Sequence, residues 1–440
     1  MDRTGPAPIE RQLKIYGLDG MNPGLFLLLA LLWLGLFAIL VCGLFGLIWD
    51  VLWHELPNRT DSNGVWDWRF RLVQLTALTT VLGGVIALPI TLNKVRLTME
   101  QTATAKAALF NSKITEAAAD LHATRQVSKK VGKNKWETVW EDDIVRRNAA
   151  IDRLEGLVRE EPAEAGRVSR LLSVYVRELS KEYPAQKTPD TDDIKKLKDW
   201  AKALKIARSD IENAVQMLGR LADINGVYSQ NLEIDLRRAN LQAMDLKRLS
   251  YPSANFDHAQ MQGALLSHSS LENASFCHAD MKNAVLYKIS ASFAFFTGTI
   301  MQSAVLDFST FTKADFTGAK LNRAKLQGCD LTQAHLTGAI MKSTSFAAAD
   351  IRMVHLRGIV ICEDADLTMA NLQGSAVKGS DFGQLQHIAD HLDTVFGDDT
   401  TRLPNGVSKL NHWPQEELSF GDFEVQWRKW TMTIDIDIPE

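Results

Sequence analysis

The sequence predicts a membrane-anchored multidomain protein that ends in a four-sided solenoid. Three observations lead to this class: two uncharged apolar segments near the N-terminus, a helical stretch after them, and a five-residue rhythm beyond. With 440 residues the chain is long enough for several domains. The rhythm is the most informative of the three, because neither a helix nor a flat strand has a period of five.

The five-residue rhythm places one large and one small residue on each short segment. Every fifth residue from Leu236 to Ile361 is apolar, which makes 26 positions, including Tyr251. The residues two places earlier form a second set, of which 15 are Ala and 5 are Ser, Thr or Cys. One residue is inserted after Ile361, and the rhythm resumes at Leu367 and continues to Phe382. Such a pattern predicts a solenoid with a packed interior.

Residues 20 apart resemble one another, which predicts four pentapeptides per coil. Gly298, Gly318, Gly338 and Gly358 form one such series. Glycines at one repeated corner suggest a turn that requires a positive φ there. About 30 repeats make roughly 7.5 coils, and at about 4.8 Å between stacked strands the tube is about 36 Å long.

Ala239-Asn240-Leu241 and Ala314-Asp315-Phe316 resemble the A-(D/N)-(L/F)-x-x unit of the pentapeptide-repeat family. The resemblance implies a right-handed quadrilateral β-helix, here over residues 231–383. The flanking segments are similar to those of a bacterial membrane-anchored subgroup with two transmembrane helices and a helical segment before the repeats. That subgroup implies little about function.

Two apolar segments predict a transmembrane helical hairpin over residues 24–92, with helices at about 24–52 and 70–92. Each segment is long enough to cross a bilayer. Basic residues are more frequent in the N-terminal arm (residues 1–23) and after residue 92 than in the connecting loop. This bias predicts a multi-pass protein of the bacterial inner membrane with both termini in the cytoplasm.

Small residues at a spacing of four occur on both predicted spans. Ala38, Cys42 and Gly46 form one set. Thr76, Thr80 and Gly84 form the other. Small residues at this spacing permit close helix contact. The contact joins either the two helices of one chain or several chains.

Residues 93–230 are predicted to form a cytoplasmic helical segment with armadillo-like packing, which covers the first coil of the solenoid. Ser209-Asp210-Ile211-Glu212 has the pattern of a capping box. Residues 384–440 are predicted to cap the other end. This cap is expected to contain a helix over 384–396, three covering tryptophans (Trp413, Trp427 and Trp430) and an edge strand at 434–438.

Two surfaces are candidates for contact with other molecules. Outward apolar residues form a candidate interaction surface: Leu265, Val285, Val305, Phe295, Ile300, Ile340 and Val360. They meet either a partner or the chain's own helical segment. A basic cluster meets either anionic lipid or only solvent: Arg125, Lys129, Lys130, Lys133 and Lys135.

The sequence carries no motif of an enzyme, and no catalytic, cofactor-binding or metal site is predicted. His335, His355 and Asp315 share one column of the solenoid and are the best metal candidate, but ordinary polar decoration of a β-face is the favoured interpretation. Between residues 231 and 384 there are 14 acidic and 14 basic residues, so the solenoid is neutral. Mimicry of DNA requires a dense negative surface, and no nucleic-acid partner is expected.

These observations favour a non-enzymatic, membrane-tethered scaffold that presents a rigid cytoplasmic surface to a protein partner. The alternative is an oligomeric membrane effector, active in stress or anti-phage defence, whose cytoplasmic region gates a membrane leak. Membrane lipid and further copies of the chain are candidate partners in either case.

Overall fold

The computed structural model describes residues 22–53, 62–131, 136–191, 193–359, 364–434 and 436. The chain divides into two compact units, Met1–Ser112 and Lys113–Glu440, and each is described by itself. Four features predicted from the sequence lie wholly or partly outside the described residues. They are most of the N-terminal arm, Val360, the pair Lys133 and Lys135, and most of the 434–438 strand.

The first unit contains two helices, α2 (Pro23–Trp53) and the beginning of α3 (Ser62–Asp120). Both are long and apolar enough to be candidate membrane spans. α2 agrees with the predicted 24–52 helix. α3 begins before residue 70, and past residue 92 it continues into the segment that was also predicted to be helical. The two helices contact each other directly, since Trp33 Nε1 donates to the carbonyl of Val85 at 3.3 Å. Arg71 and Asp50 form an ion pair at 2.8 Å.

The contact between α2 and α3 is made by large side chains rather than by the small-residue sets. A Cβ added at Gly43 would lie 3.7 Å from Leu78. A Cβ added at Gly46 or Gly84 would meet nothing within 4 Å. Cys42 is exposed as well. Both small-residue faces therefore point away from the partner helix of the same chain.

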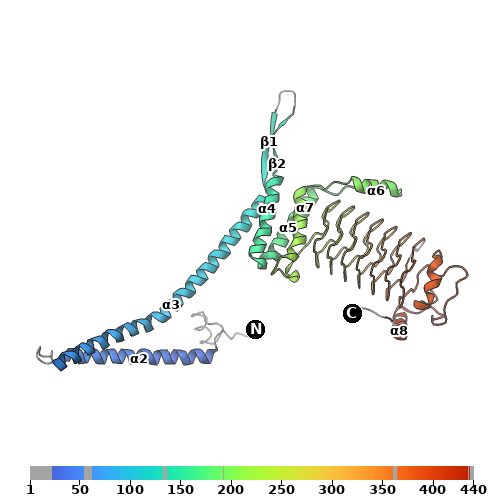
Figure 1. The fold of residues 1–440 in the computed structure, drawn as a ribbon. Helices are drawn as coiled ribbons and strands as arrows, with labels where there is room; N and C mark the ends of the chain where they lie inside the picture. Colours follow the sequence, from blue (N-terminus) through green and yellow to red (C-terminus); the bar gives the residue numbers. More distant parts are fainter. Residues whose placement is uncertain are drawn as a thin grey trace. The chain divides into compact units, whose positions relative to one another are not determined.

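The second unit begins with a β-hairpin that the sequence analysis did not predict (Figure 1). Strands β1 (Thr124–Lys130) and β2 (Trp136–Asp142) pair antiparallel, with Val127 opposite Val139. The prediction of an entirely helical segment over 93–230 is therefore wrong at these residues. The alternation of Trp136, Thr138 and Trp140 has the two-residue period of a strand, which is the physical reason for the hairpin.

Helices follow the hairpin in the order α4 (Ile144–Glu160), η1 (Pro162–Glu164), α5 (Ala165–Glu182), α6 (Ile194–Ala203), α7 (Ser209–Arg220), η2 (Leu221–Asp223) and η3 (Ser229–Asn231). α4, α5 and α7 each bury an apolar face. The predicted capping box is wrong: Arg208 is the N-cap residue of α7, and it makes no side-chain capping bond. The Glu212 carboxylate instead accepts from the backbone N–H of Asp245 at 2.9 Å.

The repeats form a β-helix in which each outward residue pairs with the residue one coil later. Parallel bridges join residues that are 20 positions apart, as Asp235 pairs with Asn255, and a new bridge begins at every fifth residue. The predicted one-residue insertion is confirmed, because the bridge from Ser345 reaches Asp366 after 21 residues. The ladder extends past the predicted boundary at residue 383, since Arg402 pairs with Asp381. The last two bridges, to Phe396 and Arg402, are thus formed by the 384–440 segment that was predicted to be a cap.

The large inward residues are buried and stack from coil to coil. Phe256, Phe276, Phe296 and Phe316 form a nearly parallel column, with successive ring centroids 4.8, 5.1 and 4.7 Å apart. Each aromatic pair of this kind contributes about 1 kcal/mol beyond its area burial. The expected packed interior is confirmed by the full burial of these rings.

Two recurring sets of polar residues in the repeats bond to backbone groups. Asp315 Oδ1 accepts from the N–H of Thr317 at 2.8 Å and so closes the corner turn. The same bond to the residue two places on recurs at Asp235, Asn240, Asp245, Asn255, Asp280, Asp330, Asp350, Asp366, Asn371 and Asp381. Inward hydroxyls and one thiol donate to a carbonyl of the preceding coil, as Thr299 does to Phe276 at 2.7 Å. A polar residue in the small inward set therefore brings no unpaired group into the core.

The left-handed backbone conformation occurs at all four corners of a coil, and not only at the corner with the glycine series. Gly338 has φ +66°, but non-glycine residues such as Arg323 (φ 59°) adopt the same conformation at corners throughout the β-helix. A side chain in this conformation costs about 1 kcal/mol relative to glycine. The interpretation that positive φ belongs to one repeated corner was therefore too narrow.

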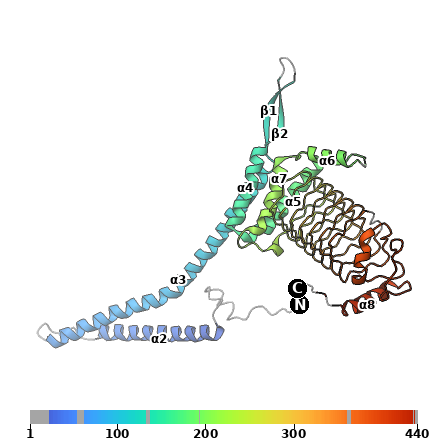
Figure 2. The same cartoon turned by 45° about the vertical axis from the view of Figure 1, so that its right-hand side comes forward.

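Both ends of the β-helix are covered by the chain's own elements (Figure 2). At the first coil the N–H of Ser250 donates to Gly219 of α7 at 2.9 Å, and the Tyr251 hydroxyl donates to the carbonyl of Val215 at 3.0 Å. At the other end Leu385 lines an apolar cavity with the inward residues Leu372 and Phe382. Trp427 of α8 (Phe420–Thr431) packs against the outer side of the later coils at His355 and donates from Nε1 to the carbonyl of Gly374 at 2.7 Å. The predicted helix over 384–396 is a 3₁₀ helix instead, η4 (Gln386–Thr394).

Candidate interaction surfaces

The predicted interaction surface lies on three of the four sides of the β-helix and does not form one face. On the first side Val285 is bridged to Leu265 and to Val305, and all three side chains are partly buried. This column is continuous over three coils. It is the only predicted set whose members are direct neighbours among the described residues.

The remaining predicted residues lie on two other sides. Ile300 and Ile340 belong to a second ladder, where Lys320 separates them. Phe295 belongs to a third ladder and is 48% exposed. Because four sides follow one another every five residues, the side of Phe295 is opposite that of Val285. Phe295 and the Val285 column therefore cannot belong to one contact face.

Aromatic residues at the corner after the Val285 side extend that apolar column. Tyr287 and Phe308 meet edge to face, with centroids 5.8 Å apart, and Phe308 is 51% exposed. A Cβ added at Gly328 would lie 2.8 Å from the Phe308 ring, so the ring covers the next coil. Neither ring was predicted, because outward apolar residues were sought only at the bridge positions. Aromatic side chains at corner positions were the available signal.

The chain's own helical segment reaches the β-helix near the same side. α6 runs beside the first coils in both ribbon views (Figures 1 and 2). A Cβ added at Gly263 would lie 3.2 Å from the carbonyl of Ala201 at the end of α6. Ala201 and Leu204 are buried. Contact with the chain's own helix thus occurs at one corner, next to the side that carries Leu265.

The histidine column is part of the C-terminal cap. His335 and His355 stack with centroids 4.3 Å apart, and Trp427 packs edge-on against His355 at 4.6 Å. The Asp315 carboxylate bonds instead to Thr317 and, at 3.1 Å, to the Thr297 hydroxyl. No group of three potential metal ligands occurs within the described parts of the chain.

The basic cluster lies on the unpredicted hairpin. Arg125, Lys129 and Lys130 are on β1, and Lys129 pairs with Glu141 across the hairpin. Trp136 and Trp140 on β2 are 64% and 66% exposed. The hairpin therefore combines cations with exposed indole rings.

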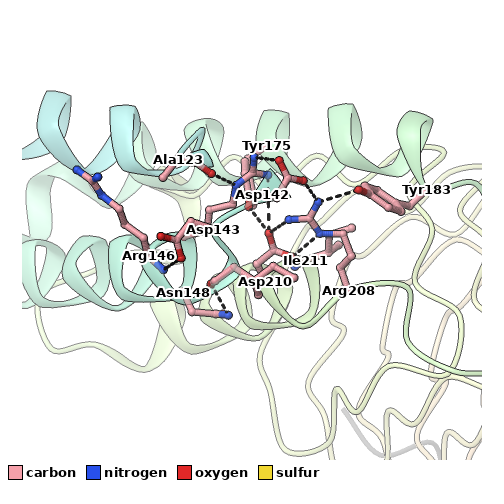
Figure 3. A network of polar contacts seen from close by, with 12 residues as sticks. Ala123, Asp142, Asp143, Arg146, Asn148, Tyr175, Tyr183, Arg208, Asp210 and Ile211 are labelled. Carbon is pink, nitrogen blue, oxygen red and sulfur yellow. Dashed lines mark hydrogen bonds and ion pairs between the residues drawn. The ribbon is translucent and has the colours of Figure 1, made fainter. Parts of the chain in front are cut away.

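A buried ion network joins the base of this hairpin to α4, α5 and α7 (Figure 3). Asp142, at the end of β2, accepts hydrogen bonds from Arg147 of α4 and from Arg208. Arg208 also donates to both carboxylate oxygens of Asp210, at 2.9 and 2.5 Å. The Tyr175 hydroxyl of α5 donates to Asp210 at 2.8 Å, and Asp210 is completely buried.

The network is charged and fully paired in the folded protein. Burial opposes the charge of Arg208, but hydrogen bonds to Asp210 and Asp142 outweigh it and raise its pKa above the ordinary value. Burial and the bond to Asp210 also raise the pKa of Tyr175. A buried, fully paired network fixes the relative positions of the elements that it joins. We therefore assign this network a structural role.

Residues 254–290, 290–328 and 319–358 match the family model for pentapeptide repeats. Together with the four-sided ladder, this match shows that residues 254–358 consist of pentapeptide repeats. No curated protein sequence matches the chain.

Solved structures with a similar fold are also pentapeptide repeat proteins. HetL, involved in heterocyst differentiation regulation in the cyanobacterium Nostoc sp. strain PCC 7120, is 20% identical, with 41% of this chain and 92% of that chain covered and a TM-score of 0.25. QnrB1, a plasmid-mediated fluoroquinolone resistance protein, is 16% identical, with 44% and 94% covered and a TM-score of 0.20. Rfr23 from the cyanobacterium Cyanothece 51142 is 15% identical, with 37% and 88% covered and a TM-score of 0.17.

Proposed function

We propose that the chain is a non-enzymatic, membrane-tethered scaffold whose β-helix presents a rigid surface to a partner protein. The observation that carries the proposal is the closure of both β-helix ends, by Gly219 and Tyr251 at the first coil and by Leu385 against the inward residues at the other end. With its ends covered, the β-helix has for contact those parts of its sides that α6 and α8 leave exposed. A rigid surface loses little conformational entropy on binding, which favours a scaffold role.

The polar residues of the repeats support a non-enzymatic role. Asp315, Asp330 and Asp350 each hold the N–H of a corner turn. The stacked ring of His355 is wedged against Trp427 in the cap. These groups therefore act in maintaining the fold.

The membrane tether in this proposal consists of α2 and the first part of α3. The charge bias of the sequence places both termini in the cytoplasm of a bacterial cell, with the spans in the inner membrane. The helical segment, for which we propose armadillo-like packing, connects the tether to the β-helix. Its buried network of Asp142, Arg208 and Asp210 holds the hairpin, α5 and α7 together within the second unit.

We also propose that the hairpin contacts anionic lipid. Trp136 is opposite Lys130, and tryptophan prefers the interfacial region of a bilayer. Each cation near an anionic surface contributes about 1 kcal/mol. Binding of the protein to vesicles containing anionic lipid should weaken in the variant W136S/W140S. Equal binding by the variant and the parent would contradict lipid contact.

Crosslinking in intact cells followed by mass spectrometry tests the scaffold proposal. The expected result is a set of crosslinks that join β-helix lysines such as Lys320 or Lys325 to a second protein. Crosslinks confined to the chain itself would overturn the proposal. The same data report self-association.

An oligomeric membrane effector is the second candidate function, and one observation favours it. The small-residue faces around Gly46 and Gly84 point away from the chain's own helix pair, so they are available to other copies. This function predicts oligomers in mild detergent and a loss of membrane potential on overexpression. A monomer together with an unchanged potential would rule it out.

A further inference from the structure

An open cavity of about 770 Å³ lies where α5 meets the first two coils of the β-helix. It is lined by Arg177, Glu178, Lys181, Arg237, Arg238, Asp257 and His258, and we call it the Arg238 groove. Grooves between modules are common binding sites. The lining is polar and charged throughout, so an apolar ligand does not fit it.

Two of the four cations in the groove share one carboxylate. Arg177 of α5 pairs with Asp235 Oδ2, and Arg237 holds both oxygens of the same residue at 2.9 Å. Hydrogen bonds from Arg237 hold the pKa of Asp235 below its ordinary value. Asp235 is therefore ionised and offset by two guanidinium groups.

The two acidic residues that line the groove are already engaged. Both oxygens of Glu178 accept from the Lys181 ammonium, at 2.7 and 2.9 Å. Asp257 Oδ1 accepts from the backbone N–H of Cys277 at 2.9 Å and from the Ser275 hydroxyl at 2.5 Å. Counting Asp235, three carboxylates face four permanent cations, so the groove has an excess of positive charge.

Arg238 and His258 supply the groups that remain free. Both are exposed corner residues with a left-handed backbone, at φ 60° and 58°, and they lie one coil apart in the same column. Within the described residues, the Arg238 guanidinium makes no hydrogen bond or ion pair. The His258 ring stacks on that of His278 at 5.2 Å, and its ring nitrogens have no hydrogen-bond partner there.

We propose that the Arg238 groove docks an acidic segment of a partner protein. The inference rests on the proposed scaffold function and names the chemistry of one docking site. Its cations come from α5 and from the first coil, and the next coil, about 4.8 Å away, adds the His258 ring with its unpaired nitrogens, so several carboxylates along one extended segment find several partners. Charge complementarity of this kind sets specificity and association rate, and salt screens it.

The test measures binding of a fluorescent hexaglutamate peptide to the full chain in detergent, with hexalysine as the reversed-charge probe. The expected result is saturable binding of hexaglutamate at low ionic strength, which weakens as salt is added, and none of hexalysine. The variant R238Q/H258Q should weaken binding about tenfold. The matched control is R323Q, because Arg323 is also an exposed corner residue, with φ 59°, on a later coil.

Three results would overturn the inference. They are no binding of hexaglutamate, equal weakening by R238Q/H258Q and by R323Q, and displacement of the peptide by inorganic phosphate at the peptide's own concentration. The last result would identify a simple anion site. If a partner protein captured in cells still binds the R238Q variant, the Arg238 groove is not its docking site. The scaffold proposal is unaffected by that result.

Discussion

The imidazole ring of His355 stacks on that of His335 one coil earlier, with centroids 4.3 Å apart and planes 6° apart. Trp427 of the C-terminal cap packs against the same ring. Burial, together with the charges of His335, Arg357 and Arg428, lowers the pKa of His355 to about 3. This histidine is therefore neutral in the folded protein over the physiological pH range.

The depressed pKa of His355 predicts a loss of stability on acidification. In the unfolded chain His355 has a pKa of 6.5, whereas in the folded chain its pKa is about 3. The free energy of unfolding therefore decreases as the pH is lowered from 6.5 to about 3. We expect a loss of about 2 kcal/mol, less than full burial would give, because the ring is partly exposed. In H355F this contribution should disappear. Thermal unfolding of the full chain against pH measures it, with H268F as an exposed-histidine control; parallel curves for H355F and the parent would contradict the assignment.

The contact between α7 and the first coil predicts opposite effects for two helical glycines. A Cβ at Gly219 would lie 2.6 Å from the Tyr251 ring, so G219A should destabilise the protein by at least about 2 kcal/mol. A Cβ at Gly156 of α4 meets nothing within 4 Å, so G156A should stabilise it by about 0.5 kcal/mol. Chemical unfolding compares the two variants. Equal effects would mean that α7 does not cover the β-helix.

The left-handed corners predict a graded series of glycine substitutions. G338A meets no neighbour and should cost only the backbone term, about 1 kcal/mol. G298A should cost more, because its Cβ would lie 2.5 Å from Nδ1 of His278. R323G should stabilise the protein by about 0.5 to 1 kcal/mol, since glycine removes the strain at φ 59°. The midpoints of denaturant unfolding give the order, and a destabilised R323G would refute the corner conformation.

The buried network predicts a large loss when Asp210 is removed. D210A leaves the guanidinium of Arg208 without its main partner in a buried site, and the expected cost is about 3 kcal/mol. The exposed pair of Arg170 and Glu233 is the matched comparison, and R170A should change stability by less than about 0.5 kcal/mol. Thermal unfolding measures both variants. Similar small changes would show that the network does not hold the helices together.

Inward and outward positions of the β-helix were predictable because they follow one short period. The inserted residue after Ile361 was visible as a slip in that period, and the 21-residue bridge from Ser345 to Asp366 reflects it. The hairpin was missed because its strands are short and lie between helical patterns. The ion network was missed because Arg208 and Asp142, which are 66 residues apart in the sequence, meet only in the folded chain.

The division of outward residues among the sides required the coil geometry to be followed explicitly. Phe295 and Val285 are only ten positions apart, yet ten positions correspond to two sides, so the two residues face opposite directions. Tyr287 and Phe308 were overlooked because outward apolar residues were sought only at the bridge positions. The contact of Ala201 with the Gly263 corner depends on the course of the 184–208 segment, which has no repeat to reveal it.

Site-specific photo-crosslinking in intact cells tests the membrane-tethered scaffold most directly. A photoreactive phenylalanine analogue is placed at Phe295, at Val305 or at Phe308, on different parts of the outer surface. The account predicts that at least one position yields a discrete protein partner in the membrane fraction, and that the partner is lost from that fraction when residues 24–92 are deleted. Absence of any partner at all three positions, or recovery of the chain from the soluble fraction with its spans intact, would contradict it.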